Sequence, residues 1–593
     1  MTYAPPLADM GFALRNLIGV PNMQQLGFEV TPELIDDVLS GAGALAAGTF
    51  APLNYSGNKT GARMEDGKAV MPEGFAAAYR AFTEGGWNAV PFDAEIGGMG
   101  LPWSVAFCIQ EMFQAANLSL ALATLLNQGA IELLATHGQQ EVKNRYLPKL
   151  VSGAWTGTMN ITEPQAGSDV AAIRTTAKPQ DGYFSIVGQK IFISYGDHDM
   201  AENILHFVLA RLPDAPPGTK GLSLFLVPKM LVKSDGTLGK ANDVRVVSIE
   251  HKLGQHASPT CVMAYGDNGG AIGYLIGQQH GGMAAMFTMM NNARIGVGIQ
   301  GLALAERAYQ DARNYAQTRV QGHDMRLKKN SPPVPIIAHP DVKRMLMTMR
   351  SQIEAGRAFF VLAGHMADRT RKNEDDRLAA IQLDLFTPIL KAWLTDMSNE
   401  VTSLAIQVCG GMGYIEEAGI AQHYRDARVL AIYEGTNGIQ AQDLVFRKLA
   451  SDQGMAMFRI CTEIKKLESE LGRLGTDRTR KIREQLAFAR TDLESATQAM
   501  VDYLVNDRLA AAAGAAHYLR LAGIVLGGLC LAQSAAHATQ LLAAAPAEDQ
   551  AFLNDKNTTA LFYAEQILPQ TTGLRMIITD GKDTVCTVSE SYF

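Results

Sequence analysis

The chain has 593 residues, of which 47% are apolar and 19% are charged, and this ordinary globular composition argues against large-scale disorder. The length is too great for one compact core, so several domains are expected. The formal net charge of −7 leaves no basic surplus to displace counterions, which argues against non-specific nucleic-acid binding.

The first half of the chain predicts a helical region followed by a β region. Residues 1–155 are rich in Ala and Leu at helical spacing, and Thr31 before a proline predicts a helix start with Thr31 as N-cap. Residues 156–285 carry short alternating or β-branched runs separated by turn signals. Two of these runs, 184–187 and 191–194, are expected to form short strands. We therefore expect a β domain inserted into a helical protein.

The second half of the chain predicts helices. Within residues 286–455, the segments 294–318 and 339–367 carry apolar residues at three- and four-residue steps, as long amphipathic helices do. Residues 456–593 are expected to be helical up to about Leu568. The order α, β, α and a further α region predicts an α+β protein with four domains.

The sequence contains no clear signal for secretion, membrane insertion or metal binding. The start lacks a basic stretch before an apolar core, and the most apolar run, 521–532, is too short to span a bilayer and is expected to be a buried helix. A cytoplasmic protein is therefore expected. No two of the six cysteines have CxxC spacing, so reduced and mostly buried thiols are expected rather than disulfides or a zinc site.

The first candidate motif is MNITEPQAGSD, at residues 159–169. Such a stretch can simply be a loop between two elements. Alternatively, its small residues let the backbone approach a planar polar ring closely, while Thr162 and Ser168 supply hydrogen-bond donors. The sequence leaves both interpretations open.

The second candidate motif is IYEGTNGIQ, at residues 432–440. It can be a junction in which Gly435 ends one element and Thr436 caps the next helix. In either case Glu434 is flanked by apolar and small neighbours, and desolvation is expected to raise its pKa towards neutrality. A carboxylate with such a pKa is suited to act as a general base.

The third candidate motif is QVCGGMGY, at residues 407–414. A glycine cluster between helices is usually a turn, although bare backbone N–H groups can also bind a pyrophosphate. No GxGxxG follows a strand, so this motif gives little support to a Rossmann fold.

Taken together and in this order, the three motifs resemble those of the acyl-CoA dehydrogenase family, over roughly residues 75–450. TEPQAGSD is similar to the flavin-contacting segment of that family, YEGTNGIQ to the segment carrying the catalytic Glu, and QVCGGMG to the segment reaching FAD in the neighbouring subunit. The resemblance implies a helical N-terminal domain (1–155), a middle β domain (156–285), a C-terminal four-helix-bundle domain (286–455) and an additional helical domain (456–593).

The resemblance also implies a set of ligand-binding residues. Phe192 stands where the family usually has Trp, which keeps an aromatic face but removes the indole N–H. Arg319 matches an arginine that contacts FAD across the dimer. The implied FAD-binding residues are Met159, Ile161, Thr162, Gly167, Ser168, Phe192, Ile193, Ser194, Arg319, Gln407, Gly410, Gly411, Thr436 and Gly438. The implied substrate-binding residues are Ser168, Arg294 and Gly435.

The resemblance finally implies the reaction, an FAD-dependent α,β-dehydrogenation of an acyl-CoA thioester with Glu434 as base. Some family members carry the base immediately before the CoA arginine, but Ala293 occupies that position here and cannot act. The chain is most similar to a bacterial branch of about 600 residues whose substrates include 3-(methylthio)propanoyl-CoA, an intermediate of dimethylsulfoniopropionate breakdown.

Several partners and alternatives accompany this prediction. We expect a homodimer with an electron-transfer flavoprotein as acceptor, and we expect no nucleic acid, membrane or metal partner. The alternatives are a short- or medium-chain acyl-CoA dehydrogenase, an acyl-CoA oxidase, and a flavoprotein of this fold that binds nucleic acid. The last would need a basic stripe on the C-terminal helices, and 473–483 is only modestly basic.

Overall fold

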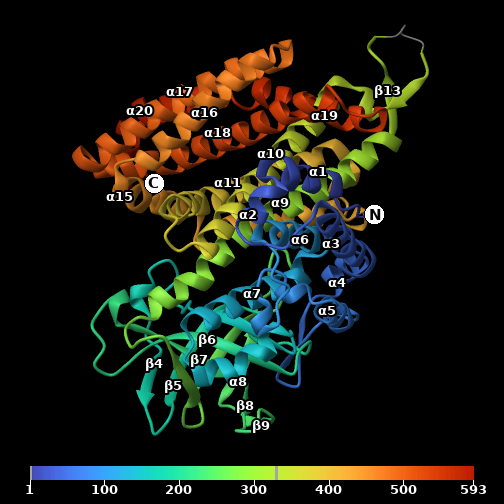
Figure 1. Ribbon diagram of the computed structural model, residues 1–593. Helices are drawn as coiled ribbons and strands as arrows, with labels where there is room; N and C mark the ends of the chain where they lie inside the picture. Colours follow the sequence, from blue (N-terminus) through green and yellow to red (C-terminus); the bar gives the residue numbers. More distant parts are fainter. Residues whose placement is uncertain (1–2, 327–330) are drawn as a thin grey trace.

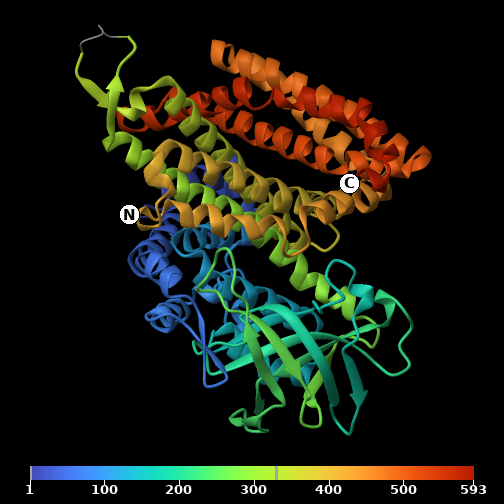
Figure 2. The same ribbon diagram turned by 180° about the vertical axis from the view of Figure 1, so that it is seen from behind.

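The computed structural model describes residues 3–326 and 331–593 (Figure 1). In both views the β domain lies at one end, the long central helices follow, and a C-terminal group of helices lies on the far side, with the N-terminal helices beside the central helices and the β domain (Figures 1 and 2). The predicted α+β class, with a helical bundle and an extra C-terminal helical region, is confirmed.

The N-terminal region is helical apart from one short hairpin. Thr31 caps α3 as predicted, because its hydroxyl accepts a hydrogen bond from the Leu34 amide at 3.2 Å. The helices are α1 (Leu7–Phe12), α2 (Val20–Gln25), α3 (Pro32–Leu45), α4 (Pro52–Thr60), α5 (Phe75–Glu84), α6 (Trp103–Ala116), α7 (Leu118–His137) and α8 (Gln140–Val151), and the hairpin is β1 (Arg63–Glu65) with β2 (Lys68–Val70).

An eight-stranded sheet forms the β domain, in the order β10-β11-β5-β12-β7-β6-β3, with β4 pairing to β5 and β6. The two short strands expected at 184–187 and 191–194 are one strand, β5, because the intervening residues pair with β11 and continue the ladder. The strands are β3 (Trp155–Asn160), β4 (Thr176–Pro179), β5 (Phe184–Ser194), β6 (Asn203–Arg211), β7 (Leu222–Pro228), β10 (Val244–Ile249), β11 (Thr260–Tyr265) and β12 (Ala271–Ile276), and a separate hairpin is β8 (Met230–Val232) with β9 (Leu238–Ala241).

Three long helices, α9 to α11, dominate the central layer. Arg357 on α10 lies in its core and pairs with Glu111 of α6 at 2.6 Å and Glu306 of α9 at 2.7 Å, so one buried cation joins three helices. The elements of this region are α9 (Gly282–Thr318), β13 (Val320–His323), β14 (Pro333–Pro335), α10 (Pro340–Lys372), α11 (Arg377–Cys409), α12 (Gly411–Tyr414), α13 (Ile420–Arg428), α14 (Asn437–Asp443), the π-helix η10 (Leu444–Leu449) and α15 (Ala450–Asp452).

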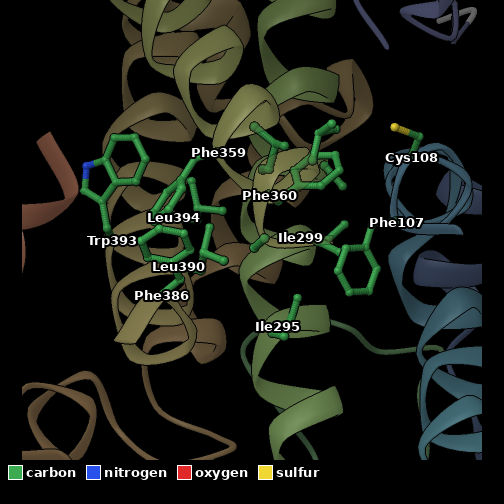
Figure 3. Close-up of a cluster of buried hydrophobic side chains, with 14 of the residues drawn as sticks. Phe107, Cys108, Ile295, Ile299, Phe359, Phe360, Phe386, Leu390, Trp393 and Leu394 are labelled. Atoms are coloured by element: carbon green, nitrogen blue, oxygen red, sulfur yellow. The ribbon is translucent and has the colours of Figure 1, made fainter. Parts of the chain in front are cut away.

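Aromatic side chains fill the core between these helices (Figure 3). Phe359 packs edge-to-face on Phe386 with ring centroids 5.0 Å apart, and Trp393 lies beside them, towards the C-terminal helices. On α18, Gly523 and Gly527 face Trp393 so closely that a methyl group at residue 523 would lie 2.4 Å from its Cγ. The fourth region is therefore packed directly on the core of the bundle.

The C-terminal region is helical to residue 587, so the expected end near Leu568 was wrong. Helix α19 ends at Gln566, but Pro569 is the N-cap of a further helix, α20, where the missing N–H of proline interrupts no helical hydrogen bond. The helices are α16 (Met455–Leu474), α17 (Asp477–Asn506), α18 (Arg508–Leu542), α19 (Ala547–Gln566), α20 (Gln570–Asp580) and α21 (Lys582–Thr587).

Three helical segments of the described chain are long and apolar enough to cross a membrane: 32–60, α7 and α18. The run 521–532 lies inside the 35-residue α18, so the argument from its length does not hold for the whole helix. Its predicted burial is confirmed, because 89% of the apolar window in α18 lies inside the protein, and the same share holds for α7. Packing within the fold thus accounts for the apolar character of both helices.

Candidate active site

One cavity of about 920 Å³ lies where the β domain meets the central helices and the start of α18. It brings together side chains from two of the three motifs, although these motifs are about 270 residues apart in the sequence. The predicted site residues that line it are Met159, Ile161, Thr162, Gly167, Ser168, Phe192, Ile193, Ser194, Arg294, Glu434 and Gly435.

Glu434 lines this cavity from a tightly turned segment just before α14. Its φ of +57° lies in the left-handed region that non-glycine residues seldom adopt, and Gly435 follows with φ +84°. At residue 435 a side chain would meet the amide of Gln440 at 2.6 Å. Thr436 then caps α14 by accepting a hydrogen bond from the Ile439 amide at 3.2 Å, as predicted. The turn therefore places the Glu434 carboxyl against the cavity.

The surroundings of Glu434 oppose its ionisation, and two cations partly compensate. Burial raises the pKa of Glu434 above its usual value, while the positive charges of Arg294 and Lys391 act in the opposite direction. Arg294 is itself buried, and its Nε has no hydrogen-bond partner among the described residues. The sequence prediction of a partly desolvated Glu434 with a raised pKa is confirmed.

Lys391 is a member of the site that motif reasoning missed. It is fully buried on α11, and its ammonium donates to Oδ1 of Asn437 at 2.9 Å. The amide of Asn437 donates in turn to Asp396 at 2.7 Å, which ties the start of α14 to α11. Burial lowers the pKa of Lys391 to about 7, against the opposing effect of Glu434. A lysine inside an otherwise apolar helical pattern was the signal that could have identified it.

On the opposite side of the cavity, the loop after β3 is fixed by a buried ion pair. Lys190 lies 2.8 Å from the Glu163 carboxylate and donates to the carbonyl of Ile161 at 2.9 Å. Glu163 also accepts hydrogen bonds from the amides of Arg174 and Thr175. Burial alone would raise the pKa of Glu163, but Lys190 and these hydrogen bonds outweigh it and lower the pKa to about 2. Glu163 lies inside the first motif, yet its role as an anchor was missed.

The face formed by this loop and β5 suits a flat, partly polar ring. Phe192 is 59% exposed at φ +58°, so an aromatic side chain is presented to the cavity rather than to the core. No atom of the described residues lies within 4 Å of the position that a Cβ of Gly167 would occupy, which leaves room for a ligand beside the loop. The hydroxyls of Thr162, Ser168 and Ser194 surround this apolar surface. The residues present therefore fit an isoalloxazine ring.

The methionines of α9 divide between the core and the cavity. Met286 and Met289 are fully buried, as a core stripe would be, whereas Met283 and Met290 line the cavity. This stripe of α9 is therefore part of the core on one side and part of the cavity wall on the other. Flexible thioether side chains give the cavity an adaptable apolar wall.

A second set of cavity residues comes from elements that the motifs did not cover. Asp443, Phe446 and Arg447 extend the wall along α14 and η10, and Arg508 and Leu509 come from the first turn of α18. The fourth region thus contributes to the cavity. Its local sequence carried no signal for this contribution, which depends on how α18 packs beside α14.

Six predicted cofactor residues do not line the cavity. Arg319, Gln407, Gly410 and Gly411 are exposed at the end of α9 and the junction of α11 with α12. Because these four are expected to contact FAD bound by a neighbouring subunit, their roles stay a prediction. Thr436 caps α14 and Gly438 is exposed on its first turn, and their contacts with FAD stay a prediction.

Comparison with known families covers most of the chain. Models of the acyl-CoA dehydrogenase N-terminal, middle and C-terminal domains match residues 59–154, 158–267 and 280–449. A fourth model, "Acetyl-CoA dehydrogenase C-terminal like", matches residues 460–589.

Relatives and a solved structure extend these matches to the full length. A 3-methylmercaptopropionyl-CoA dehydrogenase of Ruegeria pomeroyi is 43% identical over 99% of this chain and 100% of its own. The broad-specificity linear acyl-CoA dehydrogenase FadE5 of Mycobacterium tuberculosis is 33% identical over the full length of both chains. The structure of Caenorhabditis elegans ACDH-11 in complex with C11-CoA covers 98% of this chain and 96% of its own, with a TM-score of 0.79 at 21% identity. The chain belongs to the acyl-CoA dehydrogenase family, as a full-length relative of its roughly 600-residue bacterial members.

Proposed function

We propose that this FAD-dependent acyl-CoA dehydrogenase uses Glu434 as the base that removes the α-proton of its thioester substrate. The observation that carries the proposal is the position of Glu434 in one cavity with the ring-binding face of Phe192 and Ser194. A thioester held between them would have its α-carbon near the carboxylate. Within the described residues, the backbone N–H of Glu434 donates no hydrogen bond and can polarise the thioester carbonyl.

The protein's part in the reaction is placement, exclusion of water and proton transfer. Glu434 takes the α-proton onto its carboxylate, and the raised pKa of that carboxyl brings it closer to the pKa range in which a base is efficient. FAD, when bound, supplies the acceptor for the β-hydrogen, which leaves as hydride. The apolar walls from Leu126, Met290 and Phe287 limit the access of water to the reacting carbons.

Replacing the base gives the most direct test. We expect Glu434→Gln to fold and to retain FAD, because the amide keeps the shape of the side chain, and to lose at least about three orders of magnitude in kcat, within the range for a general base. Dye reduction with an acyl-CoA substrate and the 450 nm absorbance of bound flavin are the two measurements. Turnover close to wild type in this variant would rule out Glu434 as the base.

For the substrate, we propose 3-(methylthio)propanoyl-CoA, converted to 3-(methylthio)acryloyl-CoA. The full-length identity of 43% to the Ruegeria enzyme supports this choice, and the methionine-lined wall can accommodate a thioether. A short or medium straight-chain acyl-CoA is the second candidate, which the relationship to the M. tuberculosis enzyme supports. Comparing kcat/KM for the methylthio, butanoyl and octanoyl thioesters decides between the two.

We further propose an electron-transfer flavoprotein as the electron acceptor, a homodimeric assembly and a cytoplasmic location. The dimer is supported by Tyr414, Met412 and Ile415, which are 83%, 49% and 45% exposed beside the predicted cross-subunit residues Gly410 and Gly411. An anaerobic dye assay compared with peroxide formation in air separates a dehydrogenase from an oxidase. Sedimentation analysis tests the dimer.

A further inference from the structure

The wall of the cavity beyond Glu434 carries a row of guanidinium groups alternating with phenyl rings. Arg294 and Arg447 lie against the ring of Phe287, at 5.8 and 5.4 Å, and Arg508 lies 5.1 Å from the ring of Phe446. All five side chains line the same cavity as Glu434. Arginines that stack on aromatic rings keep their N–H groups in the plane free to bind an anion.

The charges of this row are only partly balanced inside the protein. Asp443 pairs with Arg447 at 2.9 Å, and Asp507, the neighbour of Arg508, is engaged as the N-cap of α18 and with Lys582 at 3.4 Å. Among the described residues, Arg508 forms no ion pair with a carboxylate. Its guanidinium is exposed at the edge of the cavity and is available to a ligand.

The position of Arg508 relative to Glu434 indicates the ligand. Asp443, Phe446 and Arg447 of α14 and η10 line the same cavity as these two residues, and the Arg508 guanidinium lies over the ring of Phe446. In a CoA thioester the pantetheine arm separates the thioester from the phosphorylated nucleotide, so Glu434 and Arg508 can contact opposite ends of one extended molecule. The ring-binding face lies on the opposite side, on the β domain, so Arg508 belongs to the substrate side of the cavity.

We infer that the additional C-terminal domain is part of the substrate site, and that Arg508 binds the phosphates at the nucleotide end of the CoA thioester. This inference rests on the proposed function for the identity of the thioester, and it gives the fourth domain a role in recognising CoA. Arg447 and the ring of Phe446 complete the binding surface, since guanidinium groups match phosphate oxygens and an aromatic face accepts an adenine or an amide.

The test compares Arg508→Gln with Arg520→Gln, a control on the same helix whose arginine pairs with Glu400 at 2.7 Å and does not line the cavity. Binding of coenzyme A, and of pantetheine without its phosphates, is measured by titration calorimetry on the FAD-loaded proteins. We expect Arg508→Gln to weaken CoA binding by about tenfold or more, the usual effect of losing a hydrogen bond to a charged group, and to leave pantetheine binding unchanged. Arg508→Lys should fall between the two, because it keeps the charge without the fork of donors.

Three other results of this experiment would separate the inference about Arg508 from the proposed function. Equal CoA affinity in Arg508→Gln and wild type overturns the inference. A loss of flavin absorbance in Arg508→Gln, with unchanged CoA affinity after FAD is restored, also overturns it and assigns the arginine to FAD. A wild-type protein that binds CoA through Arg508 but turns over no acyl-CoA would refute the proposed function and leave this inference intact.

Discussion

At the scale of single residues, Glu434 and Lys391 are a pair of ionisable groups in which the charge of each favours the charged form of the other. Burial disfavours the charged form of both groups, so it raises the pKa of Glu434 and lowers that of Lys391 to about 7. Below pH 7 Lys391 carries a proton and favours the carboxylate form of Glu434. Above pH 7 Lys391 becomes neutral and no longer favours the carboxylate form of Glu434.

This pairing predicts a pH-dependent effect of Lys391→Met. Removing the cation raises the pKa of Glu434 further, so kcat should fall several-fold below pH 7 and stay near wild type at pH 8 to 9, where Lys391 is already neutral. The kcat–pH profile between pH 5 and 9 is the measurement, with flavin content as a check on folding. A uniform loss at every pH would instead indicate that Lys391 only positions Asn437.

At the scale of elements, the loop after β3 holds its shape through one buried charge pair. Residues 162–168 have few backbone hydrogen bonds of their own, and Glu163 supplies the missing anchors by accepting from Lys190, Arg174 and Thr175. Because the pKa of Glu163 is depressed to about 2, its stabilising contribution is complete above its ordinary pKa and is lost as the pH falls towards 2.

We expect Glu163→Gln to destabilise the protein by about 3–5 kcal/mol, because it leaves the Lys190 ammonium buried without its partner. The thermal midpoint and the flavin content should both decrease. The double variant Glu163→Gln, Lys190→Met removes the stranded charge and should recover most of the midpoint. If the double variant is no more stable than Glu163→Gln, the buried charge is not the cause.

At the scale of the whole molecule, α18 joins the fourth region to the bundle through glycines that allow close approach to Trp393. Because Gly523 and Gly527 lack a Cβ, the helix can approach Trp393 closely. A Cβ at either position would lie within 2.8 Å of the indole ring. At this contact the fourth region therefore packs directly on the core of the central helices.

Gly523→Ala should destabilise this interface by about 1–3 kcal/mol, as overpacking does, although alanine is the better helix former. Gly573→Ala in α20 is a matched control, since no atom in the described part of the chain lies within 4 Å of a methyl group there and the change should stabilise the helix by about 0.5–1 kcal/mol. Thermal unfolding of the two variants should therefore shift in opposite directions. A rise in both midpoints would contradict the packing argument.

The sequence by itself determined the element types and the chemistry of the motifs. The cap at Thr31, the caps and turn around Glu434 and the raised pKa of Glu434 depend on residues within a few positions, and local patterns report such features. The family followed from three motifs in a fixed order, while the domain boundaries and the roles of Arg319, Gln407, Gly410 and Gly411 stay predictions.

Only the tertiary structure decided which distant residues meet. The approach of Lys391 to the segment after Glu434, of Lys190 to Glu163, and of Arg508 to the substrate side of the cavity depends on how α11, β5 and α18 pack. Side-chain packing between elements far apart in the chain has no local signature, because the same lysine or arginine is equally compatible with an exposed helix face. The composition of α18 indicated that this helix is buried, but it did not indicate that the helix lines the cavity that contains Glu434.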